Sequence, residues 1–182
     1  LNFKKGKFLS VILNYDPLSE SLFKWYQQLV AESLGKKSKG IIPIISNMPK
    51  DNHSLMQYYL DGKPKCFYTF FFSHSKKNKK IIDKKIHKPF EFLKGKDINE
   101  ILYSQNIATQ NVFNKKKIPF RSFEIKKRDE KTLGTLFTFF ILETILLSNL
   151  LKVNPFDQPS VELIKQETKN VLLNKRSKNN FR

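Results

Sequence analysis

The sequence predicts an α/β fold with a largely parallel sheet. Short apolar runs alternate with longer segments in which apolar residues recur at helical spacing, and this order is typical of parallel strands joined by helical crossovers. The apolar runs lack the alternation of a half-exposed strand, which favours strands buried on both faces. With 182 residues, of which 40% are hydrophobic and 13% aromatic, the chain is long and apolar enough to form the core of one domain.

The first predicted strand and helix lie next to each other in the sequence. Residues 8–15 form an apolar run that Asp16 and Pro17 end, which predicts a buried strand. Residues 18–34 are predicted to form a helix. Its apolar side holds Leu22, Phe23, Tyr26, Leu29 and Val30. A strand followed at once by an amphipathic helix is the beginning of a crossover unit.

The second predicted strand covers residues 40–45. Pro43 within it predicts an irregular or edge position, because proline cannot donate a hydrogen bond to a neighbouring strand. A short helix is then expected from about His53 to Leu60, with Asp51 or Asn52 as its N-cap.

The third strand is predicted at residues 66–72, and the Lys-rich segment 73–96 after it is expected to be loop with some helix. Asp97-Ile-Asn-Glu100 matches a capping box, which predicts a helix from there to about Asn114. Residues 118–126 are predicted to form a further strand.

Residues 133–151 are about as long as a transmembrane helix. Glu143 lies at the centre of this segment, and a central carboxylate costs about 2.5 kcal/mol or more on insertion into a bilayer. Five further polar residues interrupt it: Thr135, Thr138, Thr144, Ser148 and Asn149. The segment is therefore interpreted as a buried core helix, and no membrane partner is predicted.

The net charge of +18 permits two interpretations. A large positive field attracts phosphates, which is typical of nucleic-acid-binding proteins. The other interpretation is a Lys-rich solvated surface with a modest attraction for an anionic substrate. Only four residues are arginine (Arg121, Arg128, Arg176 and Arg182), and no nucleic-acid-binding motif is present. The surface interpretation is preferred, and no nucleic-acid partner is predicted.

Cysteine and histidine usage excludes a disulfide framework and a metal site. Cys66 is the single cysteine, so it cannot form an internal disulfide, and this suits a reducing, cytoplasmic compartment. His53, His74 and His87 show no metal-ligand spacing, so no metal or other cofactor is expected. The chain has no secretory pattern and no initiator Met, which indicates the interior of a longer polypeptide.

Three polar segments carry a family resemblance. They read Gln-Gln-x-x-Ala-Glu-Ser-x-Gly-Lys at residues 27–36, Asp-Asn-His-Ser-Leu-x-Gln at 51–57 and Asn-Pro-Phe-Asp-Gln-Pro-Ser-Val-Glu-x-x-Lys at 154–165. In this order and on these elements they resemble the C-terminal part of phosphoglucose isomerase, in its shorter bacterial forms. The resemblance covers essentially the whole chain.

The resemblance implies a three-layer α/β/α sugar-isomerase-type (SIS) lobe with a mostly parallel sheet plus C-terminal helices. It implies a homodimer with a shared active site that interconverts glucose 6-phosphate and fructose 6-phosphate without a metal. By the same resemblance Glu32 is the proton-transfer base, His53 opens the sugar ring and Lys165 is the active-site lysine. Gln28 and Gln158 fall on glutamines that line the sugar site.

The spacing within the motifs supports these assignments. Gln28 and Glu32 are four residues apart, which places them on one helix face, and Gln158 and Lys165 are two helical turns apart. Taken alone, each is more often a solvated surface residue, and the family match reverses that expectation. A non-catalytic sugar-phosphate-binding regulatory module is the alternative function, although such a sensor needs no carbon-acid base.

Two departures from the family pattern affect the expectations. Ser160 replaces a residue that is often Gly or Ala, and it is small enough to be tolerated. The Gly-Gly-Arg segment and the Ser/Thr-rich phosphate loop of the family are absent from these residues, so the isolated chain is predicted to be nearly inactive. Residues 1–174 are expected to form the C-terminal lobe, and residues 175–182 a basic solvated tail. The apolar stripe of the last predicted helix is expected to pack in the core; it consists of Val161, Ile164, Val171 and Leu172.

Overall fold

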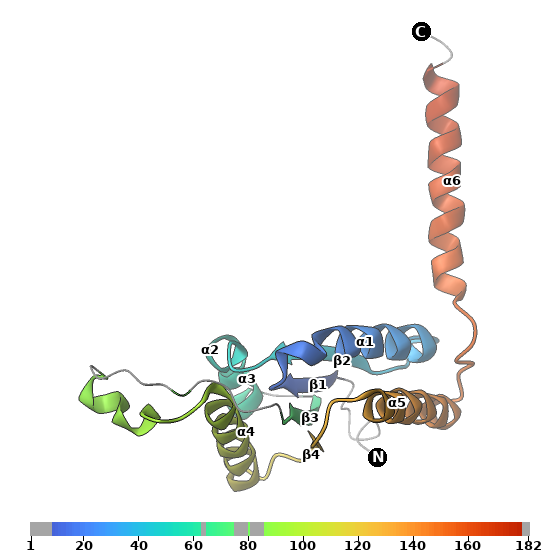
Figure 1. Cartoon of the computed structure of the whole chain (residues 1–182). Helices are drawn as coiled ribbons and strands as arrows, with labels where there is room; N and C mark the ends of the chain where they lie inside the picture. Colours follow the sequence, from blue (N-terminus) through green and yellow to red (C-terminus); the bar gives the residue numbers. More distant parts are fainter. Residues whose placement is uncertain (1–8, 63–64, 75–79, 81–85, 180–182) are drawn as a thin grey trace.

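The computed structural model describes residues 9–62, 65–74, 80 and 86–179 (Figure 1). One parallel sheet lies at its centre. Its strands are β1 (Leu9–Asn14), β2 (Ile42–Asn47), β3 (Cys66–Ser73) and β4 (Phe120–Ile125), in the order β2-β1-β3-β4. Each strand coincides with a predicted apolar run to within a few residues, so the predicted α/β fold with a parallel sheet is confirmed.

Helices cover both faces of the sheet and give the predicted three layers. One face is covered by α1 (Glu20–Leu34) and α5 (Glu130–Leu151), and the other by α3 (Met56–Asp61) and α4 (Ile98–Lys115). The short helix α2 (Asp51–Ser54) precedes α3, and α6 (Pro159–Asn179) ends the described chain. Two 3₁₀ turns, Pro17–Ser19 and Lys88–Leu93, complete the elements.

Alternate side chains of the buried strands point to opposite faces of the sheet, and each face has its own aromatic core. On the α1–α5 side, Phe23 meets Phe71 edge-on with ring centroids 4.7 Å apart. On the opposite side, Phe113 of α4 meets the rings of Tyr68 and Phe70 edge-on at 5.0 and 5.2 Å. Because β1 and β3 are buried on both faces, their side chains are mostly apolar and do not alternate with exposed polar ones, which is the pattern that the sequence showed.

Three local predictions can be compared with the structure directly. Pro43 lies in β2, which is an edge strand, as its missing donor requires. Asp97 and Glu100 form the predicted capping box at the start of α4. The predicted helix 53–60 is instead two short helices separated at Leu55, and the N-cap of the first is Lys50 rather than Asp51 or Asn52.

One helix of the described residues, α5, is long and apolar enough to cross a membrane by length and composition. In the fold, only one face of α5 is covered: Leu136, Phe140 and Leu151 are buried, whereas Leu142 and Leu146 are exposed. The interpretation as a buried core helix is therefore correct for one face only.

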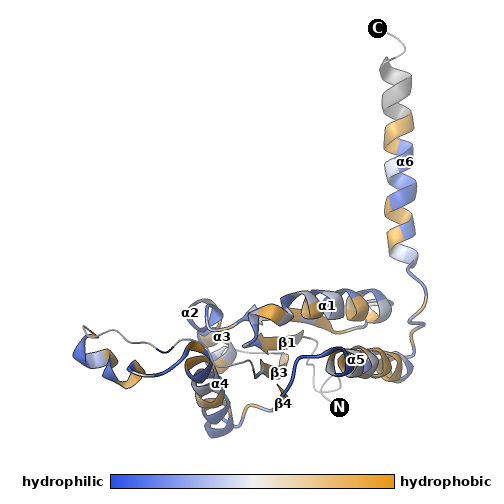
Figure 2. Ribbon diagram, in the orientation of Figure 1, coloured by the Kyte–Doolittle hydropathy of each residue, from blue (hydrophilic) through white to orange (hydrophobic). Residues whose placement is uncertain are grey.

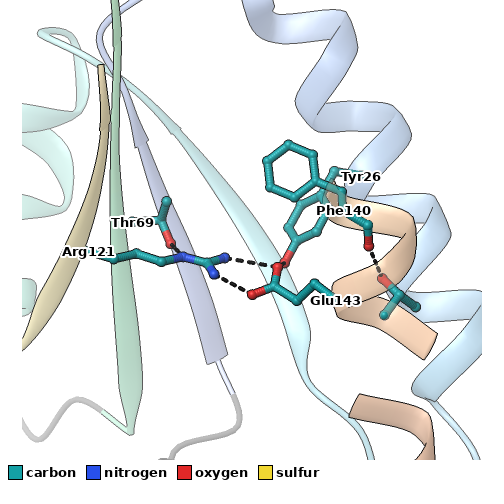
Figure 3. A network of polar contacts seen from close by, with 6 residues as sticks. Tyr26, Thr69, Arg121, Phe140 and Glu143 are labelled. Carbon is teal, nitrogen blue, oxygen red and sulfur yellow. Dashed lines mark hydrogen bonds and ion pairs between the residues drawn. The ribbon is translucent and has the colours of Figure 1, made fainter. Parts of the chain in front are cut away.

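A polar network holds Glu143 of α5 against the sheet (Figure 3). The two terminal guanidinium nitrogens of Arg121 on β4, Nη1 and Nη2, donate to the Glu143 carboxylate. Arg121 Nε donates to Thr69 Oγ1 at 3.0 Å. Tyr26 of α1 donates to the same carboxylate at 3.5 Å. Burial and, to a smaller extent, the nearby Glu143 charge raise the pKa of Tyr26 to about 12. Tyr26 therefore remains a hydrogen-bond donor at neutral pH. This arrangement explains how a carboxylate is accommodated in an apolar helix.

The last helix, α6, projects away from the α/β body (Figure 1). Orange hydrophobic and blue polar residues alternate along it, and it contacts no layer of the sheet (Figure 2). Every residue from Pro159 to Leu173 is exposed. The prediction that its apolar stripe packs in the core is wrong within this chain, because Val161 and Ile164 are 41% and 68% exposed. The helix continues to Asn179, through part of the segment predicted as a solvated tail.

The prediction for the Lys-rich segment 73–96 falls partly outside the described residues, which omit 75–79 and 81–85. Within its described part, Lys88–Leu93 form a 3₁₀ turn, and Lys80 makes an isolated antiparallel bridge with Asp97. His74 pairs with Glu124 on β4 through contacts of 2.5 Å, so its role here is structural.

Candidate active site

Glu32 lies between two glutamine side chains near the end of α1. Gln28 Nε2 donates to Glu32 Oε1 at 2.9 Å, and Gln158 Nε2 donates to Glu32 Oε2 at 2.9 Å. The first contact follows from the four-residue spacing on one helix face. The second joins residues that are 126 positions apart in the sequence, so only the fold creates it. Each carboxylate oxygen is thereby oriented by one amide, while the carboxylate itself stays exposed.

The topology explains why these segments meet. Both α1 and α5 begin at the carboxyl ends of their strands and run back, so they end near the amino edge of the sheet. Residues 152–158, which follow α5, therefore pass the end of α1. Lys152 takes a left-handed conformation with φ 54° as the C-cap of α5, which turns the chain towards α1.

Two lysines after α1 tie it to this segment. Lys39 Nζ donates to the Leu151 carbonyl at 2.9 Å. Lys36 Nζ donates to the Asn154 carbonyl and pairs with the Asp157 carboxylate at 2.7 Å. The hydrogen bond from Lys36 lowers the pKa of Asp157 from its ordinary value of 3.8. These contacts position Gln158 beside Glu32.

Lys36 and Asp157 were not assigned a role from the sequence, although both lie in the quoted motifs. Only 10% of the Lys36 side chain is exposed, which is unusual for a lysine and signals a specific partner. The available signal was the position of Lys36 directly after Gly35 at the helix exit, within the first quoted motif. A pairing across 121 residues has no local signature, so the sequence could not reveal it.

The two adjacent glutamines of the first motif have different roles. Gln27 Nε2 donates to the Pro43 carbonyl at 2.7 Å and so joins α1 to the edge strand β2. Gln28 lies on the exposed side and contacts Glu32. The structure thus separates a structural amide from the one that belongs to the candidate site.

His53 does not lie beside Glu32. It is exposed on α2, which follows β2 and therefore lies at the carboxyl edge of the sheet. Its neighbour Asp51 accepts hydrogen bonds from the Asn47 amide at 2.8 Å and from Ser46 Oγ at 3.0 Å, which fixes α2 on the end of β2. Within one chain, Glu32 near the end of α1 and His53 on α2 are thus at opposite edges of the sheet, and Figure 1 shows the two helices.

Lys165 lies on α6, six residues after the first residue of the projecting helix, Pro159. Its Nζ pairs with the Glu162 carboxylate of the same helix at 2.6 Å, and its side chain is 66% exposed. Gln158 contacts Glu32 from the loop before α6, so the two residues of the last motif contact different partners. The roles predicted for Glu32, His53, Lys165, Gln28 and Gln158 stay predictions.

The arrangement around Glu32 is suited to proton transfer. Within the described residues, no group of three or more His, Cys, Asp or Glu side chains is placed to hold a metal ion. One amide hydrogen bond to each oxygen fixes the orientation of the Glu32 carboxylate. Such a group can take a proton from a carbon acid if a substrate lies against its exposed side.

The parallel three-layer fold and the amide-oriented glutamate at its edge define a lobe of the α/β sugar-isomerase type. No family model matches the chain. Its sequence is similar to that of glucose-6-phosphate isomerases, which confirms the predicted resemblance to phosphoglucose isomerase.

Two relatives illustrate the sequence similarity. A protein of Methanococcus maripaludis named probable glucose-6-phosphate isomerase is 35% identical over 163 residues, which cover 89% of this chain and 36% of the relative. The glucose-6-phosphate isomerase of Mycoplasmopsis pulmonis is 35% identical over 171 residues, covering 90% of this chain and 39% of the relative. The chain therefore spans somewhat more than a third of the length of the curated relatives it matches.

Two solved structures share the fold. A hypothetical protein of Thermus thermophilus superposes with a TM-score of 0.85 at 24% identity, over 94% of this chain and 43% of that chain. The glucose-6-phosphate isomerase of Chlamydia trachomatis superposes with a TM-score of 0.73 at 16% identity, over 92% and 35% of the two chains.

Proposed function

We propose that the chain is the C-terminal portion of an aldose-ketose isomerase, an intramolecular oxidoreductase that interconverts glucose 6-phosphate and fructose 6-phosphate. The observation that carries the proposal is the Gln28–Glu32–Gln158 arrangement, on a chain whose relatives are named glucose-6-phosphate isomerase. The reaction belongs to glycolysis and gluconeogenesis and takes place in the cytoplasm. It needs no cofactor, because only a proton moves between the two carbons.

In the proposed mechanism, Glu32 acts as the general base. It removes the proton from the carbon next to the aldehyde, which gives an enediolate. A proton then passes from the hydroxyl oxygen of that carbon to the former aldehyde oxygen through the enediol, and Glu32 returns its proton to the former aldehyde carbon. A positioned acid or base of this kind contributes about 10²–10⁴-fold in rate. Gln28 and Gln158 each retain a second amide N–H and a carbonyl oxygen, with which they contact the sugar hydroxyl groups. Lys165 steadies the developing oxyanion charge.

The second half of the proposal is a homodimer with shared active sites. His53 opens the sugar ring, but in one chain it lies at the opposite edge of the sheet from Glu32. A second copy that presents its His53 to Glu32 removes this separation. The exposed apolar stripe of α6, which includes Ile164 and Leu172, supplies a surface for such an association because exposed apolar faces favour partners.

The test is Glu32→Gln in the complete protein, with Glu20→Gln as a matched control. Both glutamates lie on α1: Glu32 is exposed, and Glu20, which pairs with Lys24 at 2.8 Å, is partly exposed at the opposite end of that helix. We expect Glu32→Gln to lower kcat at least 100-fold while hexose-phosphate binding, measured by calorimetry, is retained. The control variant is expected to keep normal turnover.

Near-normal turnover of Glu32→Gln would refute the assigned role. The alternative function is a non-catalytic sugar-phosphate-binding module, and it makes a different prediction. In that case the unaltered complete protein binds hexose phosphates but does not interconvert them. Neither a nucleic-acid nor a membrane partner is part of the proposal.

A further inference from the structure

A pocket of about 570 Å³ lies at the other end of the lobe from Glu32. It is enclosed by the first turns of α1 and α5 and by the ends of β3 and β4. Its apolar walls include Leu22 and Trp25 of α1 and Leu136 and Phe137 of α5, above Phe71 of β3. This volume and a largely apolar lining are typical of small-molecule sites. Trp25, the lining residue of α1 that is nearest to Glu32 in the sequence, precedes it by seven residues, which corresponds to roughly 10 Å along the helix.

The position of the pocket in the sheet is also typical of ligand sites. In the sheet, β2 lies on one side of β1, and β3, which comes next in the sequence, lies on the other side. The direction in which strands are added therefore reverses between β1 and β3. In open parallel sheets, ligands bind outside the carboxyl ends of the strands at such a reversal. The pocket lies at this edge, between the turn after β1 and the last residue of β3.

Ser73, the last residue of β3, supplies an unused polar group in this pocket. It is only 7% exposed and lines the cavity, and its Oγ atom has no hydrogen-bond partner in the part of the chain that the structure describes. A buried hydroxyl without a partner costs about 1–3 kcal/mol, so such groups are uncommon unless something else binds them. A ligand in the pocket would provide the missing partner.

One cationic side chain, Arg128, borders the same pocket, together with the carboxylates of Asp129 and Glu130. Arg128 Nη2 pairs at 2.5 Å with the Asp16 carboxylate, which is 6% exposed and also accepts from Ser19 Oγ at 2.5 Å. The buried Asp16 carboxylate thus holds the Arg128 guanidinium at the pocket, where the remaining N–H groups of Arg128 can donate hydrogen bonds. The Asp129 carboxylate caps the Thr132 amide, so α5 directs its positive N-terminal end here. The chain's +18 charge adds a field that attracts anions.

We propose that this pocket binds a small molecule with an apolar ring and a carboxylate group. The ring fills the space beside Trp25, and the carboxylate accepts hydrogen bonds from Ser73 Oγ and from Arg128. The site is separate from the proposed isomerase site and does not depend on that function.

The experiment is a fluorescence titration of the complete protein with 4-nitrobenzoate, in which Trp25→Phe identifies the part of the emission that comes from Trp25. Trp25 is the single tryptophan of these 182 residues and lines the pocket, so a nitroaromatic ring bound there quenches its emission. We expect saturable quenching in the wild type. Ser73→Ala should weaken binding about tenfold, the loss expected for one hydrogen bond to a charged group. This variant removes an unpaired hydroxyl, so its thermal stability should not fall.

Two controls decide the outcome. Ser148→Ala removes a serine that is also fully buried but lies outside the pocket, and it should bind like the wild type. Nitrobenzene, which lacks the carboxylate, should bind at least tenfold more weakly than 4-nitrobenzoate. The proposal is overturned if quenching by 4-nitrobenzoate does not saturate, if Ser73→Ala binds as tightly as the wild type, or if nitrobenzene binds equally well.

Discussion

The two long helices α5 and α6 differ in what their apolar residues contact. Both carry apolar side chains at helical spacing, yet α5 buries Phe140 and Leu136 against the sheet while every residue of α6 from Pro159 to Leu173 is exposed. In addition, α5 is joined to β4 by the Arg121–Glu143 pair. An apolar stripe therefore shows that a helix needs a partner, but it does not show whether the partner lies in the same chain.

The largest expected effect comes from a core truncation on α5. Phe140 is 1% exposed and contacts the rings of Phe23, Tyr26 and Phe123. Phe140→Ala should lower the free energy of unfolding by about 3–5 kcal/mol, because it removes buried area and leaves a cavity. Leu172→Ala is the matched change on α6, where the side chain is 59% exposed.

Leu172→Ala should change the unfolding free energy of the chain by no more than about 0.5 kcal/mol at low protein concentration. Urea unfolding followed by circular dichroism measures both variants. Equal losses of stability in the two variants would contradict the difference between the helices.

A smaller effect is expected from the polar contact that joins α5 to the sheet. Arg121→Met leaves the Glu143 carboxylate half-buried without its cation, so stability should fall by about 2 kcal/mol. Arg121→Met combined with Glu143→Leu should recover most of this loss, because two apolar residues replace the pair. A double variant that is less stable than either single variant would show that the pair does not act as a unit. Thermal denaturation of all three variants provides the comparison.

The smallest expected effect concerns the first turn of α5 in acid. Hydrogen bonds from the Thr132 amide and, next in size, from the Thr132 side chain lower the pKa of Asp129 to about 2 from an ordinary value of 3.8. The cap therefore contributes fully to stability above pH 3.8, and its contribution is lost as the pH falls through about 2. Asp129→Asn should show a weaker loss of stability than the wild type between pH 4 and pH 2 when chemical denaturation is measured across this range. Identical pH profiles for the two proteins would exclude the cap as the titrating group.

The sequence predicted those parts of the fold that depend on local chemistry. Pro43 predicted the edge position of β2, and Asp97 with Glu100 predicted the start of α4. The break at Leu55 was missed because nothing in the residue types marks it. The contact between Arg121 and Glu143 joins a strand to a helix, so it depends on the tertiary fold and has no local pattern.

The candidate site was predictable to a similar degree. The spacing of Gln28 and Glu32 predicts their contact on α1. The approach of Gln158 was implied only by the family resemblance, because it requires α5 to return to the end of α1 and Lys36 to hold the following loop. The separation of Glu32 from His53 could not be predicted from spacing, since it follows from which edge of the sheet each segment reaches.

The most direct test of a shared active site is subunit mixing between two inactive variants of the complete protein. Glu32→Gln and His53→Ala are each expected to be nearly inactive alone. If Glu32 and His53 of one site come from different subunits, each mixed dimer contains one intact site and one doubly altered site. Random exchange should then restore about a quarter of the wild-type turnover, since about half of the dimers are mixed. Confirmed exchange without any gain in turnover would contradict the account, because it would mean that each site takes both residues from one chain.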